Sequence, residues 1–127
     1  MEKKELGKSG EEYCTNHLLK QGYEILRRNF FSPYGEIDII AKYKQYLVFI
    51  EVKTRTHESI EQTQCSISQN KQKKITKTAM YFLKDFQDNE IIEYRFDVII
   101  IKKENTRIHI KHFKNAFTPS EVGDFFA

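Results

Sequence analysis

Hydrophobic residues recur along the chain with two different spacings, and these divide it into predicted strands and helices. Runs rich in Ile, Val, Phe and Tyr predict β-strands, and apolar residues three or four positions apart predict amphipathic helices. The predicted helices run from about Lys8 to Gln21 and from near Ser68 to about Phe86. The predicted strands are Tyr23–Asn29, the two halves of Gly35–Arg55 on either side of a reversal at Tyr43–Gln45, Arg95–Ile101 and Arg107–Phe113.

The order of these elements predicts an α/β fold. The run from Val98 to Ile101 is apolar on both faces, which is typical of a strand covered by helices on both sides. We expect it to lie parallel to the strand that ends at Arg55, because a helix joins the two in a right-handed crossover. Residues Arg107–Phe113 alternate apolar and polar side chains and predict a half-exposed edge strand. The order α-β-β-β-α-β-β thus predicts one domain, residues 1–127, with a mixed sheet flanked by helices.

Composition narrows the class of protein. The chain has 127 residues, of which 39% are hydrophobic and 31% charged, as in a globular protein with one core. No apolar run reaches membrane-spanning length and the charged N-terminus lacks the apolar core of a signal peptide, so we expect a cytoplasmic protein with no membrane partner. Cys14 and Cys65 lack metal-ligand spacing and are expected to be reduced thiols. The net charge of +3 permits an anionic partner without requiring one.

Charged side chains interrupt the apolar strands on either side of the reversal. Side chains alternate between faces along a strand, so Glu51 and Lys53 share one face, and Asp38 can lie beside them if the strands pair. An ion pair of Lys53 with a carboxylate at a sheet edge is one explanation. A divalent-metal site is the other, because Mg²⁺ prefers hard oxygen ligands such as the Asp38 and Glu51 carboxylates and the Val52 carbonyl. Lys53 can then orient an attacking water or offset charge on a phosphate. Glu36 shares the face of Asp38, and we do not assign it to a metal.

Three acids outside these strands have ordinary structural explanations. Ser9 followed by Glu12 is a capping-box pattern, and the helix dipole favours both Glu11 and Glu12 in a first turn. Asp97 lies in the last apolar run, where we expect it to be structural and paired with Arg95 or with a loop.

The second predicted helix carries a run of lysines and no acid in its first half: Lys71, Lys73, Lys74 and Lys77. A solvated helix face is the ordinary explanation. Cations near a helix N-terminus oppose the helix dipole, however, and a bound phosphate would offset that cost. Thr54 and Arg55 leave the sheet at the end where the candidate metal site lies, followed by a polar segment, 56–66, that is expected to be a loop.

Asp38 followed by Glu51-x-Lys53 on the next strand resembles the PD-(D/E)xK nuclease superfamily. Longer stretches resemble the YraN family of small bacterial proteins, which are similar in their core to archaeal Holliday-junction resolvases. These stretches are Gly35–Asp38, Phe49–Arg55, Arg95–Val98 and Lys114–Phe117. The resemblance extends from Gly10 to Phe117 and implies a restriction-endonuclease-like three-layer core.

The resemblance also implies roles for individual residues. Gly10-Glu11 matches the opening of the family's first helix, whose glutamate reaches the metal site in related resolvases. Glu11 is therefore a candidate ligand beside Asp38, Glu51 and Val52, and the candidate catalytic residues are Asp38, Glu51, Lys53 and Glu11. The family shows a lysine where Lys71 stands, which favours a phosphate contact. The candidate nucleic-acid contacts are Arg55, Thr54, Lys71, Lys74 and Gln69.

These features lead us to expect a Mg²⁺- or Mn²⁺-dependent endonuclease that acts on DNA. The junction resolvases suggest branched or structured DNA as substrate and a homodimer as the active form. One alternative is a nucleic-acid-binding or DNA-processing accessory module that keeps the fold with little or no cleavage. Another is an α/β domain whose charges form only surface pairs.

Overall fold

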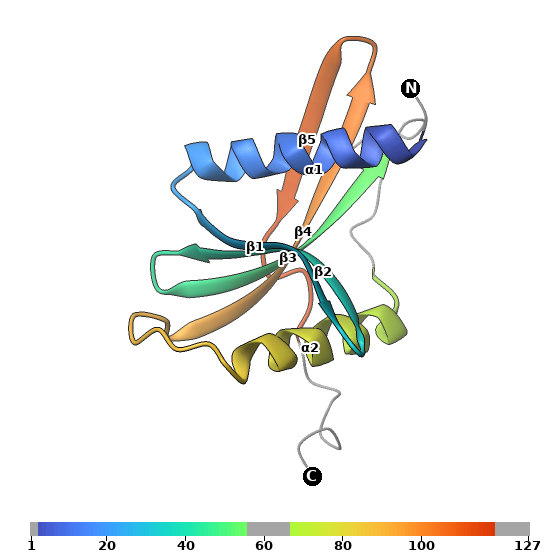
Figure 1. Cartoon of the computed structure of the whole chain (residues 1–127). Helices are drawn as coiled ribbons and strands as arrows, with labels where there is room; N and C mark the ends of the chain where they lie inside the picture. The colour runs from blue at the N-terminus through green and yellow to red at the C-terminus, as the bar shows by residue number, and fades with distance from the viewer. Residues whose placement is uncertain (1–2, 56–66, 119–127) are drawn as a thin grey trace.

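The computed structural model describes the backbone of residues 3–55 and 67–118, and side chains within these ranges from residue 10 onward. The predicted loop at 56–66 lies outside the described residues. Figure 1 shows a central sheet with one helix on each side. The elements in order are α1 (Lys3–Lys20), β1 (Glu24–Ser32), β2 (Gly35–Tyr43), β3 (Tyr46–Arg55), α2 (Gln69–Leu83), β4 (Glu93–Glu104) and β5 (Arg107–Phe113).

The strands form one mixed sheet in the order β1-β2-β3-β4-β5. Strand β3 pairs parallel with β4 across the α2 crossover, and the other neighbours pair antiparallel. This confirms the predicted α/β class, the element order and the parallel pair. Strand β4 is buried over most of its length, and β5 is a half-exposed edge strand, as its alternation predicted.

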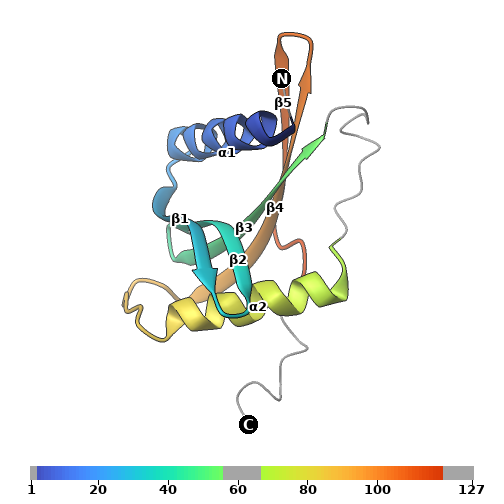
Figure 2. The same cartoon turned by 45° about the vertical axis from the view of Figure 1, so that its right-hand side comes forward.

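Each face of the sheet has its own hydrophobic cluster. On the α1 face, Leu18 packs with alternate residues of the central strands such as Val48 and Ile50. On the α2 face, Ile75 and Phe82 pack against the intervening residues, among them Phe49. Figure 2 shows the two helices on opposite sides of the sheet. Side chains of β3 therefore alternate strictly between two covered faces, which places Glu51 on the α2 side.

Helix boundaries differ from the prediction at two ends. Helix α1 begins at Lys3 and not near Lys8, so Glu12 lies well inside the helix and the predicted capping box is wrong. Helix α2 begins as predicted, because the Ser68 hydroxyl accepts a hydrogen bond from the Lys71 N–H and caps the N-terminus. It ends at Leu83, earlier than the apolar pattern suggested. Neither helix in the described ranges is long and apolar enough to cross a membrane.

Strands β2 and β3 separate partway along their length and form a fork. Their pairing runs from Tyr43 opposite Tyr46 to Ile39 opposite Ile50 and stops there. Ile39 packs in the α1 cluster, whereas Ile37, two residues earlier, packs in the α2 cluster. The hairpin of β1 and β2 therefore rotates at Asp38 and bends toward α2, where a Cβ on Gly35 would lie 3.6 Å from the Lys74 side chain.

Candidate active site

The two carboxylates predicted from the strands meet at the fork. Asp38 Oδ2 accepts a hydrogen bond of 2.8 Å from the Val52 backbone N–H, in place of the ladder bond that the separated β2 backbone no longer makes. The Asp38 and Glu51 side chains are also hydrogen-bonded to each other. Both come from strand positions, so the rigid sheet fixes their separation. The fork thus presents two carboxyl groups in contact at the end of the β2–β3 ladder.

Burial strongly perturbs this carboxyl pair. Burial, followed by the negative charge of Asp38, raises the pKa of Glu51 from 4.5 to about 7. Burial also raises the pKa of Asp38, against the opposing effects of the Val52 N–H and Lys71. Electrostatic repulsion opposes ionisation of both carboxyl groups when they are in contact, so the pair retains a proton close to neutral pH. A cation between the two groups would remove that repulsion.

Helix α1 brings a third acid to the fork. Gly10 allows the close approach, because a Cβ at this position would lie 2.7 Å from Thr54 Cγ2 on β3. Glu11 follows directly and is half-buried. Burial, then the charges of Asp38 and Glu36, raise the pKa of Glu11. Glu12 points elsewhere: it is exposed and pairs with Arg28 at 3.3 Å. The structure therefore places Glu11, and not Glu12, beside the carboxyl pair.

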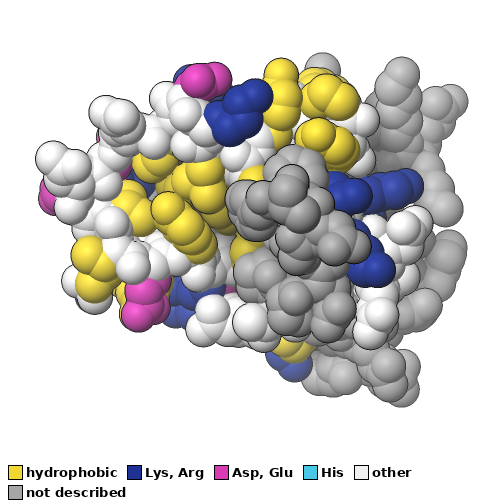
Figure 3. Space-filling model, turned by 90° about the horizontal axis from the view of Figure 1, so that it is seen from below, with side chains coloured by type: hydrophobic (Ala, Val, Ile, Leu, Met, Phe, Trp, Pro, Cys, Tyr) yellow, Lys and Arg dark blue, Asp and Glu magenta, His cyan; other side chains and the backbone are white. Residues whose placement is uncertain are grey.

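Two lysines lie next to Glu51 on the α2 side. The Lys71 ammonium is 3.6 Å from the Glu51 carboxylate, and the Glu51 side chain is only 15% exposed. Lys53, two residues along β3, is half-buried and also acts to lower the pKa of Glu51. Figure 3 shows that Lys and Arg side chains gather on the α2 side of the molecule toward the N-terminal end of that helix. Positive charge therefore borders the carboxyl pair on the α2 side.

The donor set at the fork fits a hard divalent cation. Asp38 and Glu51 supply carboxylate oxygens, and the Val52 carbonyl points toward the same gap, because the N–H and C=O of one strand residue lie on the same edge. In the described residues, no three His, Cys, Asp or Glu side chains form a group that could hold a metal ion. Glu11 therefore stands near the pair without completing a three-carboxylate cage. Mg²⁺ is commonly held by one or two carboxylates and several waters, which matches this arrangement.

Comparison with known proteins assigns the chain to a family. Residues 10–101 match the model of "Uncharacterised protein family UPF0102", a span that begins at the close-packed Gly10 and includes the whole fork. The chain belongs to the UPF0102 family. It is 42% identical over 113 residues to a UPF0102 protein of Thermodesulfovibrio yellowstonii, covering 89% of this chain and 96% of the relative. It is 43% identical over 119 residues to one from Caldicellulosiruptor saccharolyticus, covering 92% and 100%. The predicted family resemblance is thus confirmed.

The remaining predicted nucleic-acid residues of this UPF0102 chain are not all on one surface. Arg55 is on the Glu51 side of β3, and its guanidinium donates to the Thr54 carbonyl at 2.9 Å. Thr54 faces the other way, against Gly10 of α1, so the structure does not group it with Glu51. Gln69 and Lys74 are exposed on the first turns of α2, near Lys71.

Glu36 belongs to the site although the sequence reasoning left it unassigned. Burial, followed by the charge of Asp38, raises its pKa, and Lys71 opposes this. The only feature of the sequence that pointed to Glu36 was the alternation along β2, which placed it on the same face as Asp38. The signal was incomplete because the rotation of the hairpin at the fork decides whether Glu36 stays near Asp38.

Asp97 is structural, as predicted. Its carboxylate is buried and accepts hydrogen bonds of 3.0 and 3.2 Å from Arg95 Nε, with His112 Nε2 at 2.7 Å and the Asn115 N–H at 3.0 Å. Arg95 also donates to the Tyr23 hydroxyl at 2.8 Å. Burial alone would raise the pKa of Asp97, but these hydrogen bonds outweigh it and hold the pKa below its ordinary value. This network fixes the strands of the UPF0102 core away from the fork.

Proposed function

We propose that this protein is a divalent-metal-dependent endonuclease that hydrolyses phosphodiester bonds in DNA. The observation that carries the proposal is the contact between the Asp38 and Glu51 carboxyl groups at the fork, with raised pKa values and lysines beside them. If these positions had only a structural role, an ion pair or apolar residues would make the fold more stable, because adjacent buried carboxylates destabilise it. A Mg²⁺ or Mn²⁺ ion held there would act as a Lewis acid and activate a water.

We assign a separate role around that ion to each residue of the site. Asp38, Glu51 and the Val52 carbonyl would hold it, and Glu11 would order water from the α1 side. Lys53 lies beside Glu51 and is placed to orient the attacking water or to offset charge on the scissile phosphate. Lys71, whose ammonium is 3.6 Å from the Glu51 carboxylate, would contact a phosphate bound at the same site.

Branched or structured DNA is the substrate we propose, and a homodimer the active form. A junction must be cut symmetrically in two strands, which two copies of one site achieve. Light scattering of the protein with and without a four-way junction tests the dimer, and a species that remains monomeric in both conditions would contradict it.

Cleavage of a labelled DNA panel tests the activity. Four-way junction, flap, single-stranded and duplex DNA are incubated with Mg²⁺ or Mn²⁺, and we expect metal-dependent cutting that Asp38→Asn and Lys53→Ala both abolish. Two control variants should cut normally: Glu12→Gln removes an exposed acid one residue beyond Glu11, and Lys44→Ala removes an exposed lysine at the far end of the β2–β3 hairpin. Salt-sensitive DNA binding without any cutting would instead support an accessory binding module.

Metal binding is tested separately from activity. A ligand that binds only the folded state raises the melting temperature by mass action. We expect Mg²⁺ or Mn²⁺ to raise the melting temperature of the wild-type protein at pH 8 and to leave that of Asp38→Asn unchanged. Equal shifts in both proteins would show that the ion binds elsewhere.

A further inference from the structure

Strands β4 and β5 form a ribbon that extends beyond the rest of the sheet. Figures 1 and 2 both show this ribbon crossing α1 and projecting beyond it. Its two faces differ in character. Ile108 and Ile110 of β5 pack against the α1-side cluster together with Ile101 of β4. The other face carries Arg107, His109 and Lys111, which are all exposed.

The sheet register places this second face on the same side as the candidate active site. Glu51 pairs with Val98, which pairs with Phe113, so the three lie in one row across the sheet. The next row on that face is Lys53, Ile100 and Lys111, and the one after it is Arg55, Lys102 and His109. Glu104 and Arg107 pair beyond the end of β3. Cationic residues therefore begin next to Glu51 and continue to the tip of the ribbon.

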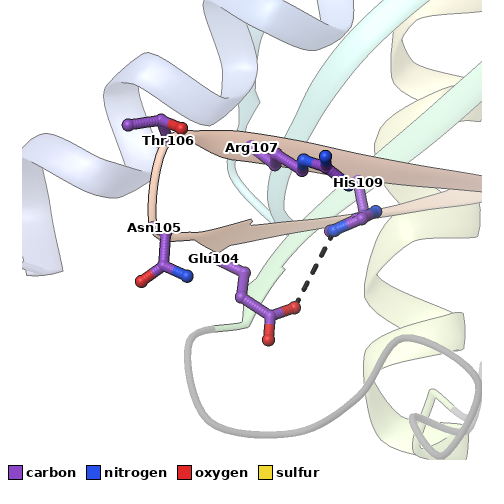
Figure 4. A pocket seen from close by; sticks show the side chains of 5 residues that line it. All are labelled: Glu104, Asn105, Thr106, Arg107 and His109. Atoms are coloured by element: carbon purple, nitrogen blue, oxygen red, sulfur yellow. Dashed lines mark ion pairs between the residues drawn. The ribbon is translucent and has the colours of Figure 1, made fainter.

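The balance of charge on this face is unusual for the chain. From Lys53 onward, the described β3–β5 positions facing this side carry five Lys or Arg residues against one acid, Glu104. The whole chain carries 21 Lys and Arg against 18 Asp and Glu. Figure 4 shows Glu104 near the tip of the ribbon, where its carboxylate lies 3.8 Å from His109 Nε2 and 3.9 Å from the Lys102 ammonium, and Arg107 is opposite it on β5. The surface therefore attracts anions over its length.

Protection of an exposed edge explains only part of this pattern. Edge strands often carry lysine to prevent pairing with another chain, and this accounts for charges on β5. It also accounts for Lys53 and Arg55, because β3 has no β2 neighbour beyond Ile50, but it does not account for Lys102, which lies between β3 and β5. Lys102 is moreover buried, and its ion pair at 3.9 Å with the largely exposed Glu104 offsets only part of the cost of burying a cation. The continuous surface indicates a ligand with repeated negative charge.

We propose that this face of the β4–β5 ribbon is a second phosphate-binding surface, which holds the DNA backbone beyond the cleavage site. The proposal rests on the proposed function for the identity of the partner as DNA. Same-face residues are about 6.6 Å apart along a strand and neighbouring strands about 4.8 Å, so Glu51 and His109 are separated by about 16 Å. At 3.4 Å per base pair, a duplex that enters the fork spans this distance in about five base pairs. The ribbon thus sets the direction in which the substrate leaves the site.

The test is a comparison of salt-dependent DNA binding between two double variants. Arg107→Gln/Lys111→Gln removes two charges from the proposed surface. Lys103→Gln/Lys44→Gln removes two charges from the opposite face of the ribbon and from the distant β2–β3 turn. Both are made in an Asp38→Asn background and measured in EDTA, with a fluorescein-labelled 30-base-pair duplex and a four-way junction as probes. This design makes the binding readout independent of cleavage and of metal.

We expect the first double variant to reduce the slope of log K against log salt by about 1.8, since each lost phosphate contact contributes about 0.9. The control should keep the slope of the Asp38→Asn parent, and both should keep its melting temperature. Equal slopes in the two double variants, or no salt-sensitive binding by the parent, would overturn the proposal. Metal-dependent cutting with a KM unaffected by Arg107→Gln/Lys111→Gln would also overturn the proposed ribbon surface, but it would leave the proposed nuclease activity intact. A ribbon-dependent slope in a protein that never cuts DNA would support the ribbon and refute the nuclease.

Discussion

Replacement of Glu51 by Gln should make the metal-free protein more stable at alkaline pH. Folding raises the pKa of Glu51 from 4.5 to about 7, chiefly through burial and secondarily through the charge of Asp38. The folded state therefore holds this proton more tightly than the unfolded state. Between pH 4.5 and 7 the unfolded chain has fewer bound protons, so stability falls as pH rises through this window and is level above it.

The magnitude follows from the two pKa values. At 1.36 kcal/mol per pKa unit, the difference between 4.5 and about 7 corresponds to a penalty of at most about 3.4 kcal/mol above pH 7. The penalty is only about 0.8 kcal/mol at pH 5, where the folded state is protonated. Gln keeps a donor for the hydrogen bond to Asp38 and loses the ion pair with Lys71. Because Lys71 is 48% exposed, that pair contributes about 0.5 kcal/mol.

We therefore expect Glu51→Gln to raise the free energy of unfolding by about 2–3 kcal/mol at pH 8 and by less than about 1 kcal/mol at pH 5. For a chain of this length, the melting temperature at pH 8 should rise by about 8–12 °C. The assay is urea unfolding in EDTA at both pH values, with Glu12→Gln as the matched control. Glu12 is exposed and its Arg28 contact is on the surface, so its replacement should change stability by less than about 0.5 kcal/mol.

Two results would refute this reasoning. If Glu51→Gln is no more stable than the wild type at pH 8, the carboxyl pair is not under electrostatic strain. If the gain is the same at pH 5 as at pH 8, its cause is packing and not ionisation. A gain that disappears when Mg²⁺ is added to the wild-type protein would connect the strain to metal binding, because the ion relieves the same repulsion.

Further predictions concern the helix approach, the buried acid network and the buried thiol. Gly10→Ala should destabilise the protein by about 1 kcal/mol in urea unfolding, because the clash of the new methyl group with Thr54 Cγ2 outweighs the gain in helix propensity. In a Thr54→Ser background, which lacks Cγ2, the same change should stabilise the protein by up to about 1 kcal/mol. Destabilisation in both backgrounds would exclude this contact as the cause. Asp97→Asn should lower the free energy of unfolding by about 3–5 kcal/mol in the same assay, because it breaks a buried ion pair. The control Asp85→Asn, at an exposed position, should lower it by less than about 0.5 kcal/mol. Similar small losses of stability in both variants would contradict a structural role for Asp97. Burial raises the pKa of Cys14 to about 12. Mass spectrometry should therefore detect no alkylation of Cys14 by iodoacetamide at pH 8 until the protein is unfolded. Rapid alkylation of the folded protein would disprove the burial of Cys14.

Local pattern alone determined the elements and much of the candidate site. The two-residue period of β3 assigned Glu51 and Lys53 to one face, and the packing of the strand between two clusters agrees with this. Ser68 marked the start of α2, and the alternation of Arg107–Phe113 marked the edge strand with the same bounds. These inferences succeeded because they depend on neighbours within a few residues, which the sequence specifies directly.

Only the tertiary structure decided how those elements combine into a site. The fork at Asp38 arises because β2 leaves β3 to pack its hairpin on α2, which local periodicity does not encode. The choice of Glu11 over Glu12 depends on how α1 rotates over β3 at Gly10.

The same holds for contacts between elements that are distant in the chain. The Lys71–Glu51 pair and the row from Arg55 to His109 join residues from different elements through packing and register. Contacts of this kind are set by the sum of many weak interactions over the whole core. The sequence therefore supplied the candidate side chains, and the register and helix packing determined which of them meet.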